Sequence, residues 1–100
     1  MIEVTRKENG ISIKGHAHFA EPGKDIVCAG VSTLAQNLVA SIEIFTEDRI
    51  EYVMQPGAVH IKHGDLSEAA QLLVDSFFVG INLIADSYPE NVRLVQAVED

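Results

Sequence analysis

The sequence predicts an α+β fold in which two long helices pack on a mixed β-sheet, in the order β-β-α-β-β-α-β. Three observations support this prediction. Two stretches carry apolar residues at the spacing of an amphipathic helix, and shorter stretches alternate apolar with polar residues as strands do. Residues that favour turns, such as Asn-Gly and Pro-Gly, separate these stretches. The 100 residues are enough for one hydrophobic core and too few for two, so we expect a single domain over residues 1–100.

The first element expected is a β-hairpin. Apolar and polar residues alternate over residues 2–7, which predicts a strand with one buried face. Residues 8–10 read Glu-Asn-Gly, a turn sequence that suits positive φ, and residues 11–14 continue as a second, antiparallel strand. Gly15 ends the alternation, and His16 follows it.

A loop and the first helix come next. Residues 17–24 show no periodicity and contain a Pro-Gly pair, which predicts a loop. Asp25 is a candidate N-cap, because its carboxylate can accept the backbone N–H of the third helical residue, Cys28. The helix is expected to extend to about Glu47. Its apolar stripe consists of Val27, Val31, Leu34, Leu38, Ile42 and Phe45.

The second half repeats the pattern of two strands and a helix. Strands are predicted over residues 50–54 and 58–63, joined by a Gln-Pro-Gly turn. Asp65 followed by Glu68 resembles a capping box at the start of the second helix, which ends before Pro89. A fifth strand is expected over residues 91–98. The apolar stripe of the second helix consists of Leu66, Ala70, Leu73, Phe77, Ile81 and Ile84, widened by Val74 and Phe78.

The composition is that of a globular protein, with 47% hydrophobic and 22% charged residues. No apolar run approaches the roughly 20 residues of a membrane-spanning helix. The first seven residues, Met-Ile-Glu-Val-Thr-Arg-Lys, lack the apolar core of a signal peptide. We therefore expect no membrane association and a cytoplasmic location.

The net charge of −8 argues against direct binding of nucleic acid, which needs a basic patch. It is compatible with a basic protein partner, and equally with acidity that only keeps the protein soluble. Because the chain has one cysteine, it cannot form an internal disulfide. That cysteine is either a small core residue or a reactive thiol.

The pattern around Cys28 favours a reactive thiol. The first turn of a helix stabilises a thiolate through its partial positive charge and unpaired amides. His16 is the histidine nearest to Cys28 in sequence apart from the loop residue His18, and it is the candidate base. The first-turn amides could also hold an oxyanion. Two roles are open for Asp25, which either caps the helix or orients His16, and Ser32 lies one turn after Cys28 on the same face.

Other interpretations remain open at this stage. Cys28 could be a buried apolar residue. Phe19, in the loop, is either a lid over a bound peptide or part of the core. No glycine-rich phosphate cradle is present. A metal site is a weaker alternative, since the spacing fits no common zinc pattern. Its ligands would be His16, His18 and Cys28, with His60 and His63 as further candidates.

Two segments resemble a known family. Gly15-His16-Ala17, then a glycine-containing loop, then Asp-Ile-Val-Cys-Ala-Gly-Val-Ser over residues 25–32, resemble the ribosomal-processing cysteine protease (Prp) family. The similarity extends over nearly the whole chain in length, element order and acidity. It implies a cysteine endopeptidase of the bacterial cytoplasm, without cofactor or metal, that removes the N-terminal extension of the large-subunit ribosomal protein L27. The alternative is a non-catalytic ribosome-assembly or binding factor for the same protein.

The resemblance also implies roles for single residues. Cys28 matches the nucleophile of the family and His16 its base, forming a Cys–His dyad. The family's aspartate and serine match Asp25 and Ser32. Its flexible loop matches residues 17–24 and would order over the substrate. We therefore expect Gly15, Phe19, Asp25 and Ser32 to support the site or the substrate. The family forms homodimers, which the extra apolar face of the second helix could accommodate.

Overall fold

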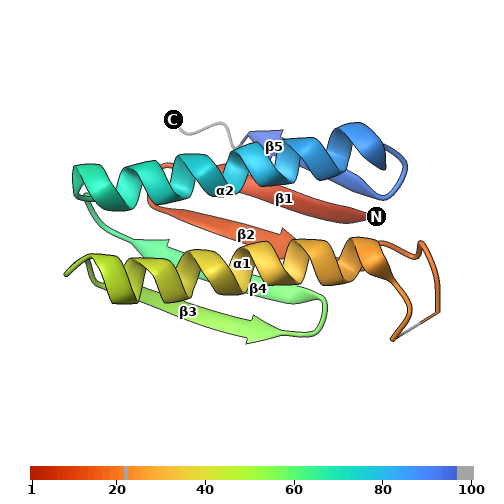
Figure 1. Ribbon diagram of the computed structural model, residues 1–100, viewed down its shortest axis with the longest axis horizontal. Helices are drawn as coiled ribbons and strands as arrows, with labels where there is room; N and C mark the ends of the chain where they lie inside the picture. The colour runs from red at the N-terminus through yellow and green to blue at the C-terminus, as the bar shows by residue number, and fades with distance from the viewer. Residues whose placement is uncertain (22, 97–100) are drawn as a thin grey trace.

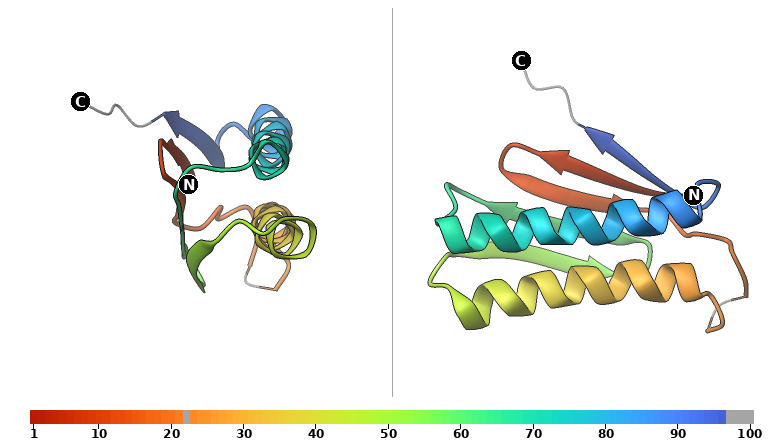
Figure 2. Two further views of the ribbon diagram at one scale, coloured as in Figure 1. Left: turned by 90° about the vertical axis from the view of Figure 1, so that its left-hand side faces the viewer. Right: turned by 45° about the horizontal axis from the view of Figure 1, so that its top comes forward.

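The computed structural model describes residues 1–21 and 23–96, and it has the predicted α+β architecture (Figure 1). Five strands form one sheet, and both helices lie side by side on the same face of it (Figure 2). The strands are β1 (Ile2–Lys7), β2 (Gly10–Lys14), β3 (Ile50–Gln55), β4 (Ala58–His63) and β5 (Val92–Gln96). The helices are α1 (Ile26–Phe45) and α2 (Glu68–Ser87).

The sheet is mixed, as predicted, with the strand order β3-β4-β2-β1-β5. The β1–β2, β2–β4 and β3–β4 pairs are antiparallel, whereas β1 and β5 are parallel, with Ile2 opposite Val92. A parallel pair requires a crossover, which α2 supplies. Residues 97 and 98 of the predicted fifth strand lie outside the described residues.

Helix α1 begins and ends for local reasons. Asp25 is its N-cap, as predicted, but the helix ends at Phe45 rather than at Glu47. Thr46 is the C-cap: its backbone is extended, with φ −133° and ψ 169°, while its N–H and its hydroxyl both donate to the carbonyl of Ile42. The prediction that Phe45 belongs to the buried stripe is wrong, since Phe45 is the last residue of the helix and is 73% exposed. The buried residues are Val27, Val31, Ala35, Leu38, Val39 and Ile42.

Helix α2 begins two residues later than an Asp65 cap would require. Its N-cap is Ser67, whose hydroxyl accepts the N–H of Ala70 at 3.1 Å. The backbone N–H and hydroxyl of Ser67 in turn donate to Asp48, at 2.7 and 2.6 Å. The prediction of an Asp65 cap was therefore wrong, because a hydroxyl anchored by a distant carboxylate takes that place.

The buried face of α2 is shifted from the predicted stripe. Its buried residues are Ala70, Val74, Phe77, Phe78 and Ile81. Leu66, Leu73 and Ile84 are only half-buried. Val74 and Phe78 pack in this chain's own core, so they are not the apolar surface expected for a homodimer. The exposed apolar side chains of α2 are Leu72, Val79 and Leu83. Dimerisation stays a prediction.

Two small residues let the helices approach closely. A Cβ atom at Gly80 would lie 2.9 Å from the side chain of Leu34, and one at Gly30 would lie 3.3 Å from Ile84. Glycine on each helix therefore makes room for a large apolar side chain of the other.

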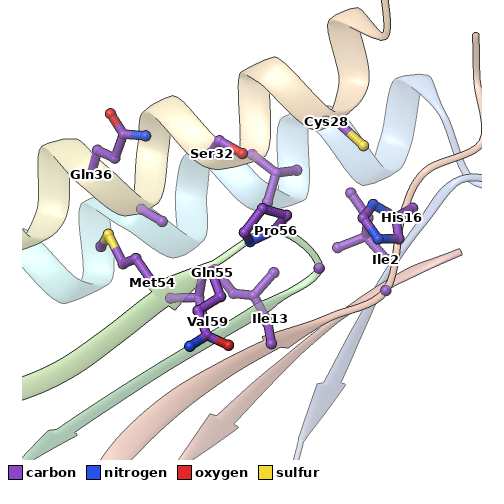
Figure 3. A pocket seen from close by; sticks show the side chains of 15 residues that line it. Ile2, Ile13, His16, Cys28, Ser32, Gln36, Met54, Gln55, Pro56 and Val59 are labelled. Carbon is purple, nitrogen blue, oxygen red and sulfur yellow. The ribbon is translucent and has the colours of Figure 1, made fainter. Parts of the chain in front are cut away.

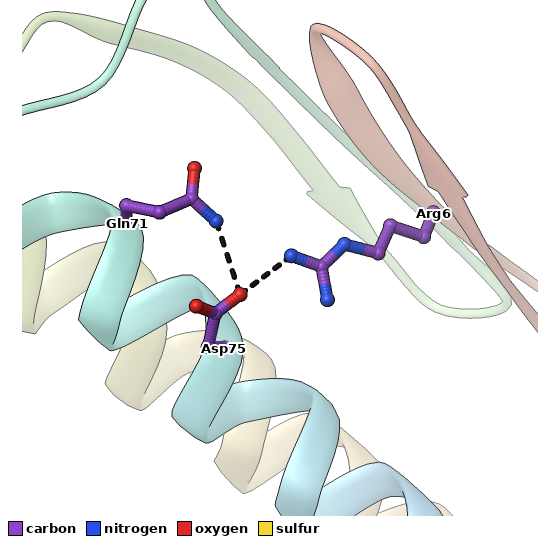
Figure 4. Close-up of polar contacts among 3 residues, drawn as sticks. All are labelled: Arg6, Gln71 and Asp75. Carbon is purple, nitrogen blue, oxygen red and sulfur yellow. Dashed lines mark hydrogen bonds and ion pairs between the residues drawn. The ribbon is translucent and has the colours of Figure 1, made fainter.

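An ion pair connects the sheet to α2. The guanidinium of Arg6 donates to Asp75 at 2.6 Å, and the amide of Gln71 donates to the same oxygen at 3.0 Å (Figure 4). The guanidinium also lies 4.6 Å from the centre of the Phe78 ring. The hydrogen bonds from Arg6 and Gln71 hold the pKa of Asp75 below its ordinary value. Because the pair is exposed, its contribution to stability is small.

Each helix has 20 residues and is long and apolar enough, by length and composition alone, to cross a bilayer. Apolar runs alone predicted no membrane span, because only uninterrupted apolar residues count toward a run. Polar residues interrupt both helices, but the mean hydropathy of each helix is still high enough for a membrane span. In the structure the apolar stripes of both helices face the sheet. The core helix of a globular domain has the same composition.

Candidate active site

Gly15 directs the chain out of the sheet at the end of β2. It has φ +97°, a conformation that side chains disfavour, and a Cβ atom there would lie 2.3 Å from the carbonyl oxygen of Met1. Its N–H donates to the carbonyl of Gly57 at 3.0 Å. The next residue, His16, therefore leaves the sheet beside the β3–β4 turn.

The imidazole of His16 lies against Gly57. A Cβ atom at Gly57 would lie only 2.6 Å from Nε2 of that ring, and Gly57 has φ +76°. His16 as a whole is exposed to solvent. Gly57 was expected only as part of a turn. The Pro-Gly pair does predict a glycine conformation, but nothing in the sequence near it points to a histidine 41 residues earlier.

Cys28 lies in the first turn of α1, as predicted, and is half-buried. The N–H of Ala17 points at its sulfur at 3.3 Å. Figure 3 shows the Cys28 side chain and the His16 ring facing each other from α1 and from the chain after β2. Among the described residues no hydrogen bond joins the two side chains. The structure thus brings the predicted thiol and imidazole to one place, while their pairing stays a prediction.

Asp25 caps the helix and holds the loop. One carboxylate oxygen accepts the N–H groups of Val27 and Cys28, each at 3.0 Å. The other accepts those of Phe19 and Ala20, at 3.0 and 3.4 Å. The N–H of Cys28 contributes most to holding the pKa of Asp25 below its ordinary value, followed by the other three donors. Of the two roles left open, the structure gives capping.

The same contacts bear on the expected oxyanion site. The N–H groups of Val27 and Cys28 are bonded to the carboxylate of Asp25, and that of Ala29 is bonded to its carbonyl at 3.1 Å. These three amides are therefore already engaged in the structure, and the oxyanion role of the first turn stays a prediction. The backbone N–H directed at the sulfur comes from Ala17, outside the helix.

Two hollows meet at the sulfur. The first, with a volume of about 420 Å³, runs between α1 and the β3–β4 hairpin (Figure 3). Its walls are mainly apolar and include Ile13, Val31, Ala35, Met54, Pro56 and Val59. The second, of about 610 Å³, lies under the loop and includes His18, Lys24 and Asp25. His16, Cys28 and Ser32 line both hollows, so an extended chain lying across the sulfur would contact both.

Phe19 is not in the core. Its ring packs edge-to-face on Tyr88, with 5.2 Å between the centroids, and its side chain is 45% exposed. Of the two interpretations offered for Phe19, burial in the core was therefore wrong. The preceding residue, His18, has φ +55°, an uncommon conformation without glycine, and its ring lies 6.0 Å from that of His16. The chain thus bends sharply where the loop leaves the site.

Two of the five alternative metal ligands, His60 and His63, lie away from the site. His60 is exposed on β4, with Ser12 opposite it in the sheet. His63 lies at the other end of β4 from Gly57, and its Nδ1 is hydrogen-bonded to the carbonyl of Gly64 at 2.7 Å. Within residues 1–21 and 23–96, no group of three or more histidine, cysteine or acidic side chains is placed to hold a metal ion.

The arrangement is suited to nucleophilic chemistry on an extended polymer. A thiol at a helix N-terminus faces an imidazole, and a backbone N–H points at the sulfur. The hollows on either side can hold a chain in extended form. Sequence reasoning predicted both Cys28 and His16, which the structure brings to one place. It missed Gly57, which contacts the imidazole, and Asn91, whose side chain donates to the carbonyl of Ala17.

Comparisons with known proteins agree with this chemistry. Residues 1–93 match the family model described as Cysteine protease Prp. The ribosomal processing cysteine protease Prp of Staphylococcus aureus is 34% identical to this chain and covers 93% of it, with 94% of that protein matched.

Two solved structures share the fold. One is an essential ribosomal processing protease Prp from S. aureus in complex with a covalently linked product peptide. It superposes with a TM-score of 0.87 at 30% identity, covering 96% of this chain and 97% of that one. The same S. aureus protease in complex with a substrate peptide superposes with a TM-score of 0.81 at 29% identity, with the same coverage.

Proposed function

The chain belongs to the cysteine protease Prp family, and we propose that Cys28 is the nucleophile and His16 the general base of its ribosomal-processing activity. One observation carries the first assignment. Cys28 is the only cysteine of the chain, so a cysteine protease built from this sequence has no other thiol to use. Its place in the first turn of α1, with the Ala17 N–H on the sulfur, supports a reactive thiolate.

The choice of His16 rests on the positions of the four histidines. His60 and His63 lie on β4, and neither lines the hollows beside the sulfur. His18 lines only the hollow under the loop, whereas His16 lines both and faces Cys28. His16 is therefore the candidate that can reach both the thiol and a leaving amine.

The proposed reaction forms and then breaks a thioester. The imidazole of His16 takes the thiol proton, and the thiolate of Cys28 attacks the carbonyl carbon of the scissile peptide bond. The carbon–nitrogen bond breaks, and the imidazolium gives its proton to the departing amine. A water molecule, deprotonated by His16, then hydrolyses the thioester and restores the thiol. The covalently linked product peptide on the S. aureus relative supports a covalent step of this kind.

We propose that the substrate is the N-terminal extension of the large-subunit ribosomal protein L27. The apolar hollow between α1 and the β3–β4 hairpin suits hydrophobic residues before the cleaved bond. The net charge of −8 would steer a basic ribosomal protein toward the enzyme. Phe19 and the loop around it would cover a bound peptide. The exposure of Phe19, and the neighbouring Ala20, which lines the second hollow, support this role.

Purified unprocessed L27 tests the proposed substrate. We expect the wild-type protein to shorten it at one bond, read as a single new mass by mass spectrometry. L27 with the residues around the junction scrambled is the matched control and should stay intact. An uncut extension, in a preparation whose Cys28 still reacts with a thiol reagent, would argue against L27 as the substrate.

Gly57→Ala should displace the imidazole of His16, because the added Cβ would lie 2.6 Å from Nε2. A displacement of the catalytic group by about 1 Å lowers kcat/KM by roughly 10- to 100-fold. The φ of +76° adds a stability cost on the order of 1 kcal/mol. Peptide cleavage and thermal melting measure the two effects separately.

Gly64→Ala is the matched control for this substitution. No atom lies within 4 Å of a Cβ built at Gly64, so activity and melting temperature should change little. If Gly57→Ala cleaved the peptide at the wild-type rate, the contact with His16 would have no catalytic importance.

A further inference from the structure

Asn91 connects the end of α2 to the active site. Its side-chain amide donates to the carbonyl of Ala17 at 2.9 Å, across 74 positions of sequence. Its own backbone is also held, because its N–H donates to Tyr88 at 2.9 Å and its carbonyl accepts the N–H of Ile2 at 2.8 Å. These two hydrogen bonds fix the backbone from which the Asn91 side chain extends.

Ala17 is held from both sides. Its N–H points at the sulfur of Cys28 at 3.3 Å, and its carbonyl accepts from Asn91. The residue is 2% exposed, and the chain turns sharply at the next residue, His18, with φ +55°. Beyond that point, the described loop hydrogen bonds are those of Phe19 and Ala20 with Asp25 and of Lys24 with Glu21, and the Phe19 ring packs on Tyr88. Before Ala17, the ammonium of Met1 donates to the carbonyl of His16 at 2.7 Å. Asn91 is the side chain that donates to the Ala17 carbonyl.

We propose that Asn91 is a positioning residue of the protease, holding the Ala17 N–H on the Cys28 sulfur. A hydrogen bond to sulfur favours the thiolate over the thiol, and a thiolate is the reactive form. The inference rests on the proposed role of Cys28 as nucleophile. The Asn91 side chain donates to the Ala17 carbonyl and not to the sulfur, so its effect passes through the backbone of Ala17.

The side chain can be changed without removing the backbone contacts of Asn91. Asn91→Ala deletes the donor, and Asn91→Asp keeps the shape but replaces the donor with a carboxylate that repels the Ala17 carbonyl. Both variants keep the backbone hydrogen bonds to Tyr88 and Ile2. Asn82→Ala, on an exposed position of α2, is the matched control.

The rate of Cys28 alkylation by iodoacetamide, measured near neutral pH, reports the reactivity of the thiol. We expect alkylation about threefold slower in Asn91→Ala than in the wild type, the effect of a typical net hydrogen bond. The loss should be larger in Asn91→Asp and absent in Asn82→Ala. Wild-type alkylation rates in both Asn91 variants would overturn the proposal, since a purely structural role would change stability alone.

A second measurement needs no variant. In the wild-type protein, the Ala17 amide proton should shift in the NMR spectrum as Cys28 titrates, and one side-chain amide proton of Asn91 should exchange slowly. If neither were seen, the inference would fail even where the variants did not fold. Neither experiment uses L27, so uncut L27 together with an Asn91-dependent thiol would remove the proposed substrate and leave this inference standing.

Discussion

Replacing Cys28 by alanine is expected to abolish peptide cleavage, with a loss on the order of 10³-fold or more. The variant has no sulfur to form the thioester, and the chain has no second cysteine to substitute for it. The fold should persist, because the Asp25 cap binds the backbone N–H of residue 28 and not its side chain. Mass spectrometry of a peptide spanning the L27 junction measures the loss, and circular dichroism checks the fold.

Cys28→Ser is the matched variant, since it keeps the size of the side chain and a hydrogen-bond acceptor for the Ala17 N–H. It should bind the peptide as the wild type does and cleave it no faster than the alanine variant. Full cleavage by Cys28→Ala would refute the nucleophile assignment. The alternative of a non-catalytic binding factor predicts unchanged affinity in both variants and no product from the wild type.

His16→Ala should show the second largest loss, roughly 10²- to 10⁴-fold in kcat, because both proton transfers depend on this imidazole. The side chain is exposed, so its removal leaves no buried cavity and should change the melting temperature little. The opening left beside Gly57 can also admit a small base. Added imidazole should therefore restore part of the activity, measured as the cleavage rate against imidazole concentration.

Two other histidine variants serve as controls for this prediction. His18→Ala removes the ring 6.0 Å from that of His16, and His60→Ala changes an exposed position on β4. We expect His60→Ala to cleave like the wild type and His18→Ala to keep most of its activity. A loss in His18→Ala equal to that in His16→Ala would move the base assignment to His18 or divide it between the two rings.

The elements of this fold could be predicted wherever their signals are local. Residue alternation gave β4 with its observed bounds, and the Asp25 cap placed the start of α1 correctly. The errors arose where a distant group decides the outcome. Ser67 replaces the predicted Asp65 cap because Asp48 holds it in place. Asp48 precedes the β3–β4 hairpin and Ser67 follows it, so the two are 19 positions apart. Likewise, alternation along β1 and β5 cannot show that the two strands pair in parallel.

The candidate site follows the same division. Cys28 and His16 stand 12 positions apart in a short segment, and helix geometry with motif resemblance was enough to select them. Gly57 and Asn91 reach the site through the packing of β3, β4 and β5 around β1 and β2. Their contacts depend on three-dimensional proximity, for which the sequence near each residue carries no signal.

The pairing of β5 with β1 sets a condition on when the protein becomes active during its synthesis. A ribosome releases β1 and the proposed nucleophile and base early, whereas the β5 segment that lies beside Ile2 comes 90 positions later, at Val92. Contacts this far apart in sequence form late and slowly. The turn that carries Asn91 reaches Ala17 only then. If Asn91 has the proposed role, a growing chain gains a competent site only when the last strand docks.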